Sequence, residues 1–94
     1  MSSRIDRSWT VFVSIENSEH DKCVDFFSRA DRSYGFEEFR RDVEDAGQWT
    51  PVQGYSGAAY VSSNDALDAA ERSVSWLFQI LARNPELRRR VSSG

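Results

Sequence analysis

The first residue that could perform chemistry is Ser56, in the segment Gly54-Tyr-Ser-Gly-Ala58. This spacing matches the sharp turn between a strand and a helix that exposes a nucleophilic serine in many hydrolases. Such a turn needs a helix directly after the serine and a histidine later in the chain. Here the residues after Ser56 favour a strand, and the only histidine, His20, precedes it. We therefore interpret Ser56 as an ordinary turn residue.

His20 and Cys23 form a second candidate pair. They are three residues apart, so a helix would place them on adjoining faces, where a cysteine can act as a nucleophile. Cys23 also begins an apolar stripe with Phe26 and Phe27, and a free cysteine is commonly a buried structural residue. No third group or oxyanion site is suggested. We therefore expect no catalytic residue in this chain.

Four acids, Glu16, Glu19, Asp21 and Asp25, crowd one region and could bind a hard cation. Their spacing matches no metal-binding loop, and acids at the start of a helix are favourable for the helix dipole alone. The glycines at 54 and 57 are not followed by the lysine of a phosphate-binding loop. The sequence therefore predicts neither a metal ion nor a cofactor.

Charge is distributed unevenly along this chain, whose formal net charge is −3. The segment 16–45 has ten acids and five bases, whereas the segment 83–94 has four arginines and one glutamate. Arg83 and the run Arg88-Arg89-Arg90 could contact phosphate or an acidic protein. Acidity elsewhere and the lack of interleaved aromatic residues argue against nucleic acid as the main partner. Weak nucleic-acid binding through these arginines is kept as an alternative.

Aromatic residues are the strongest sign of a binding surface. Trp49, Tyr55 and Tyr60 lie in the uncharged run 46–64 and exceed what a small hairpin needs for packing. Trp76 and Phe78 lie at opposite margins of a wide apolar arc on the last long helix. Tryptophan and tyrosine are favoured at interfaces because they bury area at little entropic cost. We predict that these five residues form an interface.

Hydrophobic periodicity predicts an element order of β-α-α-β-β-α, followed by a short helix. The strands are expected near 9–15, 49–54 and 58–62, and the helices near 19–31, 36–46, 65–83 and 85–91. In the first strand Val11 and Val13 share one face, and the last two strands form a hairpin that turns at Tyr55 to Gly57. Pro51 places the first hairpin strand at a sheet edge.

These elements predict a two-layer α+β domain, with a small three-stranded sheet and helices packed on one face. The 94 residues fit a single domain, with frayed tails at 1–8 and 92–94. With one cysteine and no long apolar run, the chain is expected in the cytoplasm rather than in a membrane. Eleven of its twelve basic residues are arginine, which suggests a GC-rich bacterial genome.

The function that fits these features is non-enzymatic protein–protein contact. The wide apolar arc, the small sheet and the edge at Pro51 favour a homodimer, and another protein is the other expected partner. An accessory, immunity-type or antitoxin-type role suits the size and acidity of the chain. The alternative is a small-molecule-binding domain or minor enzyme, with a pocket between sheet and helices lined by Tyr34, Trp49, Tyr55 and Tyr60.

Overall fold

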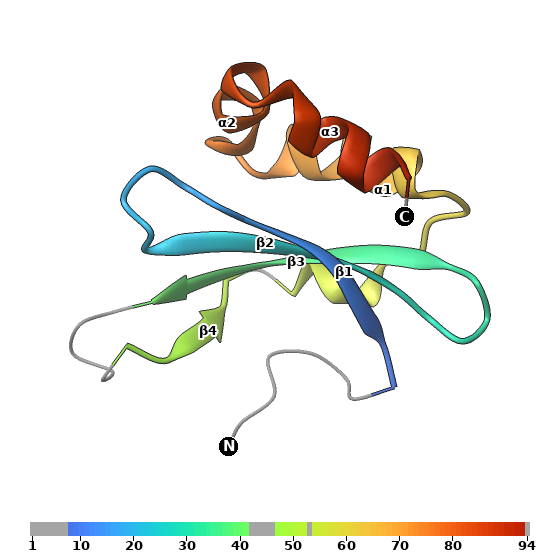
Figure 1. The fold of residues 1–94 in the computed structure, drawn as a ribbon. Helices are drawn as coiled ribbons and strands as arrows, with labels where there is room; N and C mark the ends of the chain where they lie inside the picture. The colour runs from blue at the N-terminus through green and yellow to red at the C-terminus, as the bar shows by residue number, and fades with distance from the viewer. Residues whose placement is uncertain (1–7, 42–46, 53, 94) are drawn as a thin grey trace.

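An antiparallel sheet with helices on one face forms the molecule, as the computed structural model in Figure 1 shows. The structure describes residues 8–41, 47–52 and 54–93. Within them four strands precede three helices: β1 (Thr10–Glu16), β2 (Lys22–Ser28), β3 (Tyr34–Arg41), β4 (Trp49–Pro51), α1 (Ser63–Ser73), α2 (Leu77–Arg83) and α3 (Pro85–Ser92). A 3₁₀ turn, η2 (Tyr55–Gly57), lies between β4 and α1. The predicted α+β class is confirmed, but the predicted order and the three-stranded sheet are wrong.

Strand β1 confirms the strand predicted near 9–15 and pairs with β2 at one edge of the sheet. A β-bulge shifts its register between Val11 and Val13. Directly opposed residues on antiparallel strands point to the same face. Val13 lies opposite Phe26 and faces the helices, whereas Val11 lies opposite Phe27 on the other side. The prediction that Val11 and Val13 share a face is wrong because of this bulge.

The helices predicted near 19–31 and 36–46 are wrong, because these segments form the hairpin of β2 and β3. Side chains of β2 alternate between two buried faces, with Val24 and Phe26 toward the helices and Cys23 and Phe27 away from them. A strand that is buried on both faces lacks the alternation of apolar and polar residues by which a half-exposed strand is recognised. The remaining apolar spacing fits a helix equally well. Positions 42–46 of the second predicted helix lie outside the described residues.

Two glutamates of β3, which lie in the segment predicted as a helix near 36–46, are buried carboxylates. Glu37 is 2% exposed and Glu38 is 8% exposed. On the helix side, Glu38 accepts a hydrogen bond from Nε1 of Trp76 at 2.9 Å. On the other side, Glu37 accepts from the backbone N–H groups of Glu38, Tyr55 and Ser56 at 3.0, 3.2 and 3.0 Å. Three hydrogen bonds to Glu37 and one to Glu38 thus offset part of the cost of burying these carboxylates.

The hairpin predicted over 49–62 is also wrong. Its first half is β4, which pairs with the end of β3 and places Pro51 opposite Phe39. In its second half Tyr60 pairs with Tyr34, at the start of the same strand. Both halves thus follow one edge of β3, and η2 is an excursion between them. The predicted edge position of Pro51 is confirmed, because β4 is the last strand of the sheet.

Buried Glu37 and half-buried Arg29, which have opposite charges, hold η2 against the sheet. Glu37 accepts from N–H groups of the turn, while the Arg29 guanidinium donates to the carbonyl oxygens of Ser56 and Ala58 at 2.6 and 3.3 Å. Arg29 also stacks over the rings of Trp9 and Phe27, at 4.5 and 5.0 Å from their centroids. The turn backbone is therefore satisfied at both its donors and its acceptors.

The single helix predicted near 65–83 is interrupted at Val74, where the backbone is extended (φ −106°, ψ 103°). Helix α2 begins at Leu77 after this break, and both Leu77 and Leu81 are buried. A straight helix has difficulty burying an apolar arc wider than one packing stripe. The break gives α1 and α2 different directions, so that each can turn its own stripe to the sheet. The short helix predicted near 85–91 is confirmed as α3, with Pro85 in its first turn.

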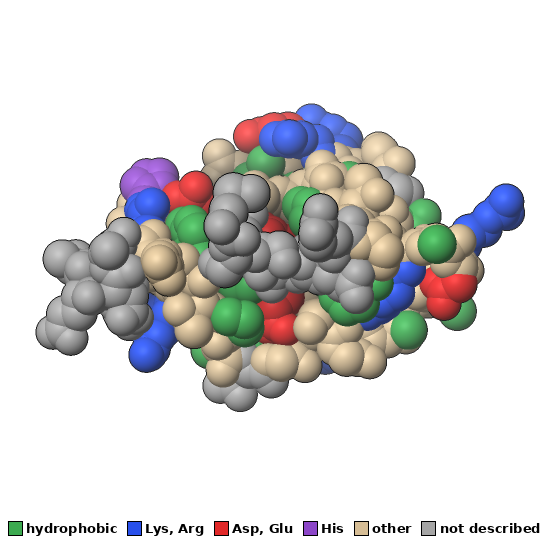
Figure 2. Space-filling view, turned by 90° about the horizontal axis from the view of Figure 1, so that it is seen from below, with side chains coloured by type: hydrophobic (Ala, Val, Ile, Leu, Met, Phe, Trp, Pro, Cys, Tyr) green, Lys and Arg blue, Asp and Glu red, His purple; other side chains and the backbone are tan. Residues whose placement is uncertain are grey.

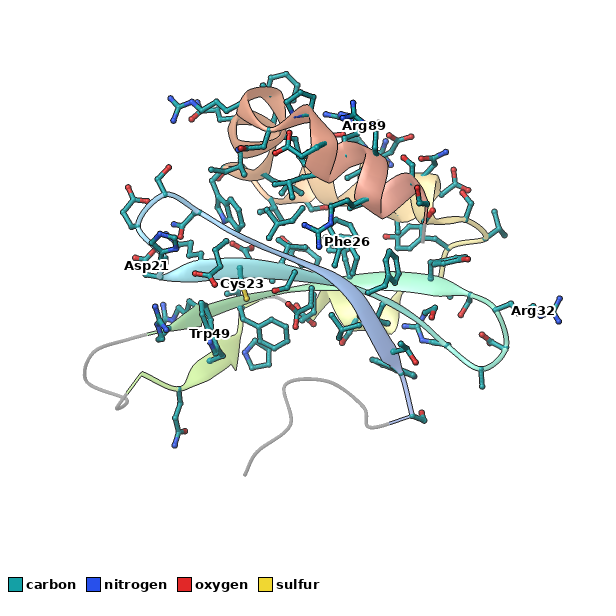
Figure 3. The ribbon with its side chains drawn as sticks, viewed as in Figure 1. Asp21, Cys23, Phe26, Arg32, Trp49 and Arg89 are labelled. Carbon is teal, nitrogen blue, oxygen red and sulfur yellow. The ribbon has the colours of Figure 1, made fainter. Side chains whose placement is uncertain are left out.

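The main core lies between the sheet and the helices. Phe26 projects from the sheet toward the helices (Figure 3), and its ring centroid lies 6.2 Å from that of Phe36. This layer comprises Val13, Ile15, Val24, Phe26, Phe36, Ala66, Leu67, Ala69, Ala70, Val74, Leu77, Leu81 and Val91.

The opposite face of the sheet has its own apolar layer. Trp9 stacks on Phe27 with the ring centroids 4.6 Å apart and the planes within 7° of parallel. Gly35, opposite Phe27 on β3, leaves the space that this ring occupies. Figure 2 shows this face, where acidic side chains lie next to hydrophobic ones. Buried Asp25 and Glu37, paired across β2 and β3, belong to the same side.

Candidate functional site

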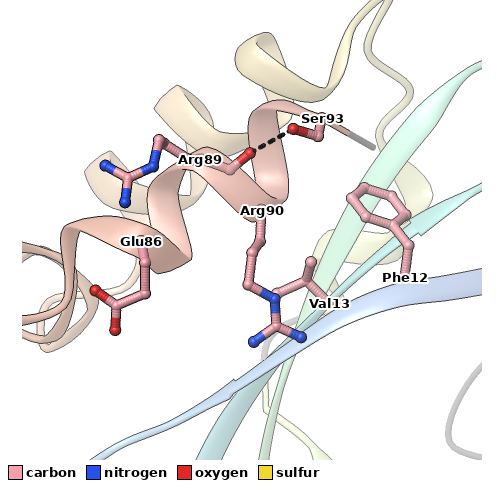
Figure 4. Close-up of a pocket in the computed structure, with 6 residues that line it drawn as sticks. All are labelled: Phe12, Val13, Glu86, Arg89, Arg90 and Ser93. Atoms are coloured by element: carbon pink, nitrogen blue, oxygen red, sulfur yellow. Dashed lines mark hydrogen bonds between the residues drawn. The ribbon is translucent and has the colours of Figure 1, made fainter.

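A groove follows the edge of the sheet between β1 and helix α3 (Figure 4). Its first part has a volume of about 620 Å³ and is lined by Phe12 and Val13 of β1 and by Glu86, Arg89 and Arg90 of α3. Its second part, of about 490 Å³, extends along residues 14–18 toward the end of α2. Because Glu86 lines both parts, we treat them as one feature, the β1–α3 groove.

The strand side of this groove offers backbone hydrogen-bonding groups. The N–H of Asn17 donates to the carbonyl of Lys22 at 3.0 Å, which makes these two residues a hydrogen-bonded pair. Such pairs alternate along antiparallel strands, so Ile15 bonds to β2 whereas the N–H and C=O groups of Ser14 and Glu16 point away from it. Among the described strands, β1 pairs only with β2. The outward groups of Ser14 and Glu16 therefore face the groove side of the sheet.

The floor of the groove is apolar and fixed. Val13 is buried, and Phe12 packs edge-on against Tyr34 with the centroids 6.1 Å apart. Ile80 and Leu87, which line the second part, pack against the main core. The floor therefore needs no rearrangement before a ligand can contact it.

The helix side is basic. Arg89 and Arg90 are exposed, and Figure 4 shows Arg90 extending from α3 toward Val13. Neither arginine forms an ion pair with another described residue, and Arg83 at the second part resembles them in this respect. Arg88 differs, because it donates two hydrogen bonds of 2.7 Å to Glu71 on α1, and this carboxylate raises its pKa. The run of three arginines thus divides into one structural residue and two that are available to a ligand.

The predicted interface residues mostly contact the protein's own chain. Tyr55 and Tyr60 pack on Phe36, with centroid distances of 5.1 and 6.1 Å. Trp76 is half-buried and hydrogen-bonded to Glu38. Trp49 also contacts its own chain, beneath the Arg41 guanidinium at 4.8 Å, whereas Phe78 is 60% exposed. A role of these residues in an interface stays a prediction.

Burial raises the pKa of Tyr55, and the charges of Glu38 and Glu37 raise it further. Its hydroxyl donates to the backbone oxygen of Ser73 at 3.3 Å. A phenol held in its neutral form is suited to donating this bond, not to acting as a base. Tyr55 therefore serves to attach η2 to the end of α1.

The aromatic residues expected to line a small-molecule pocket do not surround one cavity. Tyr34, Tyr55 and Tyr60 gather near Phe36, whereas Trp49 lies opposite Arg41, at the other end of β3. Tyr60 borders two shallow surface hollows with Val61, and neither of these hollows includes the other three rings.

The candidate catalytic residues are also separated. His20 lies in the turn after β1 with a positive φ of 59°, and its Nδ1 contacts a Glu16 carboxylate oxygen at 2.9 Å. Cys23 is fully buried in the sheet. Ser56 is held in η2 by Glu37 and Arg29. The helix that would have joined His20 to Cys23 is absent from this described segment, so the two residues do not form a nucleophile and base.

The acids near the first turn have local partners as well. Asn17 donates its side-chain N–H to Asp21 at 2.7 Å and to Glu19 at 3.2 Å, and the first of these bonds lowers the pKa of Asp21. Among the described residues, no group of three or more His, Cys, Asp or Glu side chains is arranged to hold a metal ion.

Sequence reasoning identified the arginines of this groove but not the groove itself. Arg83, Arg89 and Arg90 were recognised as a basic cluster at the end of the chain. The edge position of β1 depends on the order of strands, which the incorrect helices at 19–31 and 36–46 concealed. A correct reading of β2 and β3 would have shown a meander, whose first strand lies at an edge.

Comparison with known proteins yields no match to a family model, to a curated protein or to a solved structure. None of the described helices combines the length and apolarity that crossing a membrane requires.

Proposed function

We propose that this chain is a protein-interaction domain and that the β1–α3 groove is its docking surface. The observation that supports this most directly is the combination of an edge strand and an exposed basic helix along two adjoining hollows that share Glu86. Exposed strand edges recruit extended segments of other proteins by main-chain hydrogen bonding. Action by binding, as in an accessory, immunity-type or antitoxin-type protein, fits this surface.

The chemically capable side chains support the same proposal. Glu37 attaches η2, Glu38 bonds Trp76 and Cys23 is buried, so each has a structural contact that accounts for it. The groove, in contrast, holds Arg89 and Arg90 without such contacts among the described residues. The side chains of these two exposed arginines form no ion pair with another described residue, and they are placed to bind an acidic partner protein at the groove.

Photo-crosslinking tests this function without knowledge of the partner. Glu86, exposed and common to both parts of the groove, is replaced with photoreactive benzoylphenylalanine in the full-length chain. Irradiation in cells that naturally produce the protein is expected to give a discrete covalent adduct with a second protein. Excess unmodified chain is expected to compete for it, and a chain carrying R89E and R90E is not.

The matched control places the same photoreactive residue at Arg32, in the turn between β2 and β3. Arg32 is exposed and points away from the helices (Figure 3). Equal adducts at both positions, or none at Glu86, would contradict a docking role for the groove.

Self-association is the second candidate, and one observation favours it. Phe78 on α2 is 60% exposed, and it is the largest of the exposed hydrophobic side chains among the described residues. Phe78 lines neither part of the β1–α3 groove, so the groove residues themselves are not needed for a homodimer about this ring. The two proposals are therefore compatible, and the exposed ring provides a direct test of the second.

A further inference from the structure

We infer that the occupant of the β1–α3 groove is an extended acidic segment of a partner protein, which adds to the sheet as a fifth strand beside β1. This inference rests on the proposed function and specifies its ligand. It is carried by three features of the groove: the outward backbone groups of β1, the apolar floor, and the rim arginines that form no ion pair with the described residues.

The first feature favours an extended backbone over a small ligand. The outward N–H and C=O groups of Ser14 and Glu16 are about 7 Å apart along the strand, the repeat of two extended residues. An added strand presents complementary groups with the same repeat. The bulge between Val11 and Val13 ends this regular edge, so the available ladder is short.

The two edges of the sheet differ in their protection. β4 has three residues and contains Pro51, and both features prevent further pairing. β1 has seven residues and contains neither proline nor lysine. Helix α3 lies beside β1 but leaves the groove open, so an incoming strand has space on the helix side.

The second and third features determine the side chains of the occupant. Every second side chain of an added strand would point to the helix side of the sheet, over the floor formed by Phe12 and Val13. Arg83, Arg89 and Arg90 stand at this side, against the single exposed glutamate of α3, Glu86. Acidic residues on the occupant would neutralise the arginines, and β-branched residues would favour the extended conformation.

Two other occupants fit the groove less well. A second copy that paired its own β1 about a two-fold axis would bring both sets of arginines together, which is electrostatically unfavourable. Nucleic acid would use the arginines but would leave the strand edge unused. In addition, Arg88 is already bound to Glu71, which reduces the charge available to phosphate.

Fluorescence polarisation with synthetic peptides tests the inference. The probe is a labelled ten-residue peptide in which glutamate alternates with valine, and the reference probe replaces each glutamate with lysine. We expect the acidic peptide to bind the full-length chain with a dissociation constant below about 100 µM, and the basic peptide to bind at least tenfold more weakly. The double variant R89E/R90E is expected to bind the acidic peptide at least about tenfold more weakly, whereas R32E keeps wild-type affinity.

A second pair of variants tests strand addition itself. Glu16→Pro removes one outward N–H and leaves the bonds between β1 and β2 in place, and Glu16→Ala removes the same side chain but keeps the N–H. We expect Glu16→Pro to weaken acidic-peptide binding about fivefold relative to Glu16→Ala. Circular dichroism and the urea midpoint establish that both variants are folded before their affinities are compared.

Several results would overturn the inference. These are an acidic peptide that binds no better than the basic one, equal affinities of Glu16→Pro and Glu16→Ala, or a labelled DNA duplex that binds more tightly than the acidic peptide and is lost in R89E/R90E. Self-association that Glu16→Pro abolishes would identify a second copy as the occupant. If crosslinking at Glu86 succeeds while these tests fail, the docking surface stands and its ligand is different; if both fail, the proposed function fails too.

Discussion

At the scale of single residues, the buried carboxylate of Glu37 has the clearest structural role. It accepts three backbone hydrogen bonds, two of which come from η2, a segment eighteen and nineteen positions further along the chain. Arg29 binds the carbonyl side of the same turn. The two side chains therefore join the 3₁₀ turn to the sheet, in place of the strand pairing that β4 has with β3. The helix predicted near 36–46 would not have given Glu37 these partners, because they lie in a distant part of the chain.

Glu37→Gln is expected to destabilise the protein by about 2–3 kcal/mol, because the amide has one acceptor oxygen and its NH₂ group would face N–H donors. The free energy of unfolding from urea titration measures this effect. Glu71→Gln is the matched control: it weakens the pair with Arg88 near the surface, where the side chain of Arg88 is 40% exposed, and is expected to change stability by less than about 1 kcal/mol. Similar losses in the two variants would show that Glu37 is not an anchor for η2.

At the scale of elements, the contact between β2 and β3 depends on a glycine opposite an aromatic ring. A Cβ atom at Gly35 would lie 2.8 Å from two ring carbons of Phe27. The ring cannot easily move away, because Trp9 stacks on it at 4.6 Å and Arg29 lies over it. Gly35 is thus required by close packing between strands and not by an unusual backbone angle.

Gly35→Ala is expected to lower the free energy of unfolding by about 1–3 kcal/mol through overpacking. Gly57→Ala provides the control, since a Cβ atom there meets no atom within 4 Å, and its stability is expected to stay within about 0.5 kcal/mol of wild type. Urea unfolding of both variants measures the difference. Near-UV circular dichroism of Gly35→Ala should also change, because the Trp9–Phe27 stack is displaced. An unchanged spectrum and unchanged stability would contradict the proposed packing.

At the scale of the whole molecule, the structure separates two residues that the sequence placed together as interface candidates. Trp76 is hydrogen-bonded to Glu38 and packs against the core, whereas Phe78 is largely exposed. A substitution at Trp76 therefore reports on folding, and one at Phe78 reports on association. The wide apolar arc that favoured a homodimer belongs to two helices, α1 and α2, and each of them buries its own apolar residues within the fold.

If the chain self-associates through α2, Phe78→Ser is expected to convert a dimer at micromolar concentration to a folded 10.8 kDa monomer, which lacks only the stabilisation that association supplied. Trp76→Ala is expected to lower the free energy of unfolding by about 2–4 kcal/mol, because it opens a cavity and leaves Glu38 without its donor. Light scattering measures the mass, and urea titration measures the stability. A wild-type chain that is monomeric at this concentration would reject self-association, and would leave the groove proposal unaffected.

Features that depend on neighbours along the chain were predicted correctly from the amino-acid sequence. Strand β1, helix α3 with Pro85 in its first turn, the edge position of Pro51 and the α+β class all follow from local alternation, fixed proline geometry and composition. The sequence also showed the basic cluster that lines the groove, and it identified Trp76 and Phe78 as interface candidates.

The identity of β2 and β3, the pairing of β4 and Tyr60 along β3, and the position of the groove depend on contacts between distant parts of the chain. An apolar run buried on both faces has no period that separates a strand from a helix, so Phe26, Phe36 and Phe39 fitted either element. Glu37 and Glu38 reinforced the wrong choice, because a carboxylate can be buried only when distant groups donate to it, and those donors are assigned by the fold. Strand order, and with it the free edge of β1, is likewise a property of long-range pairing.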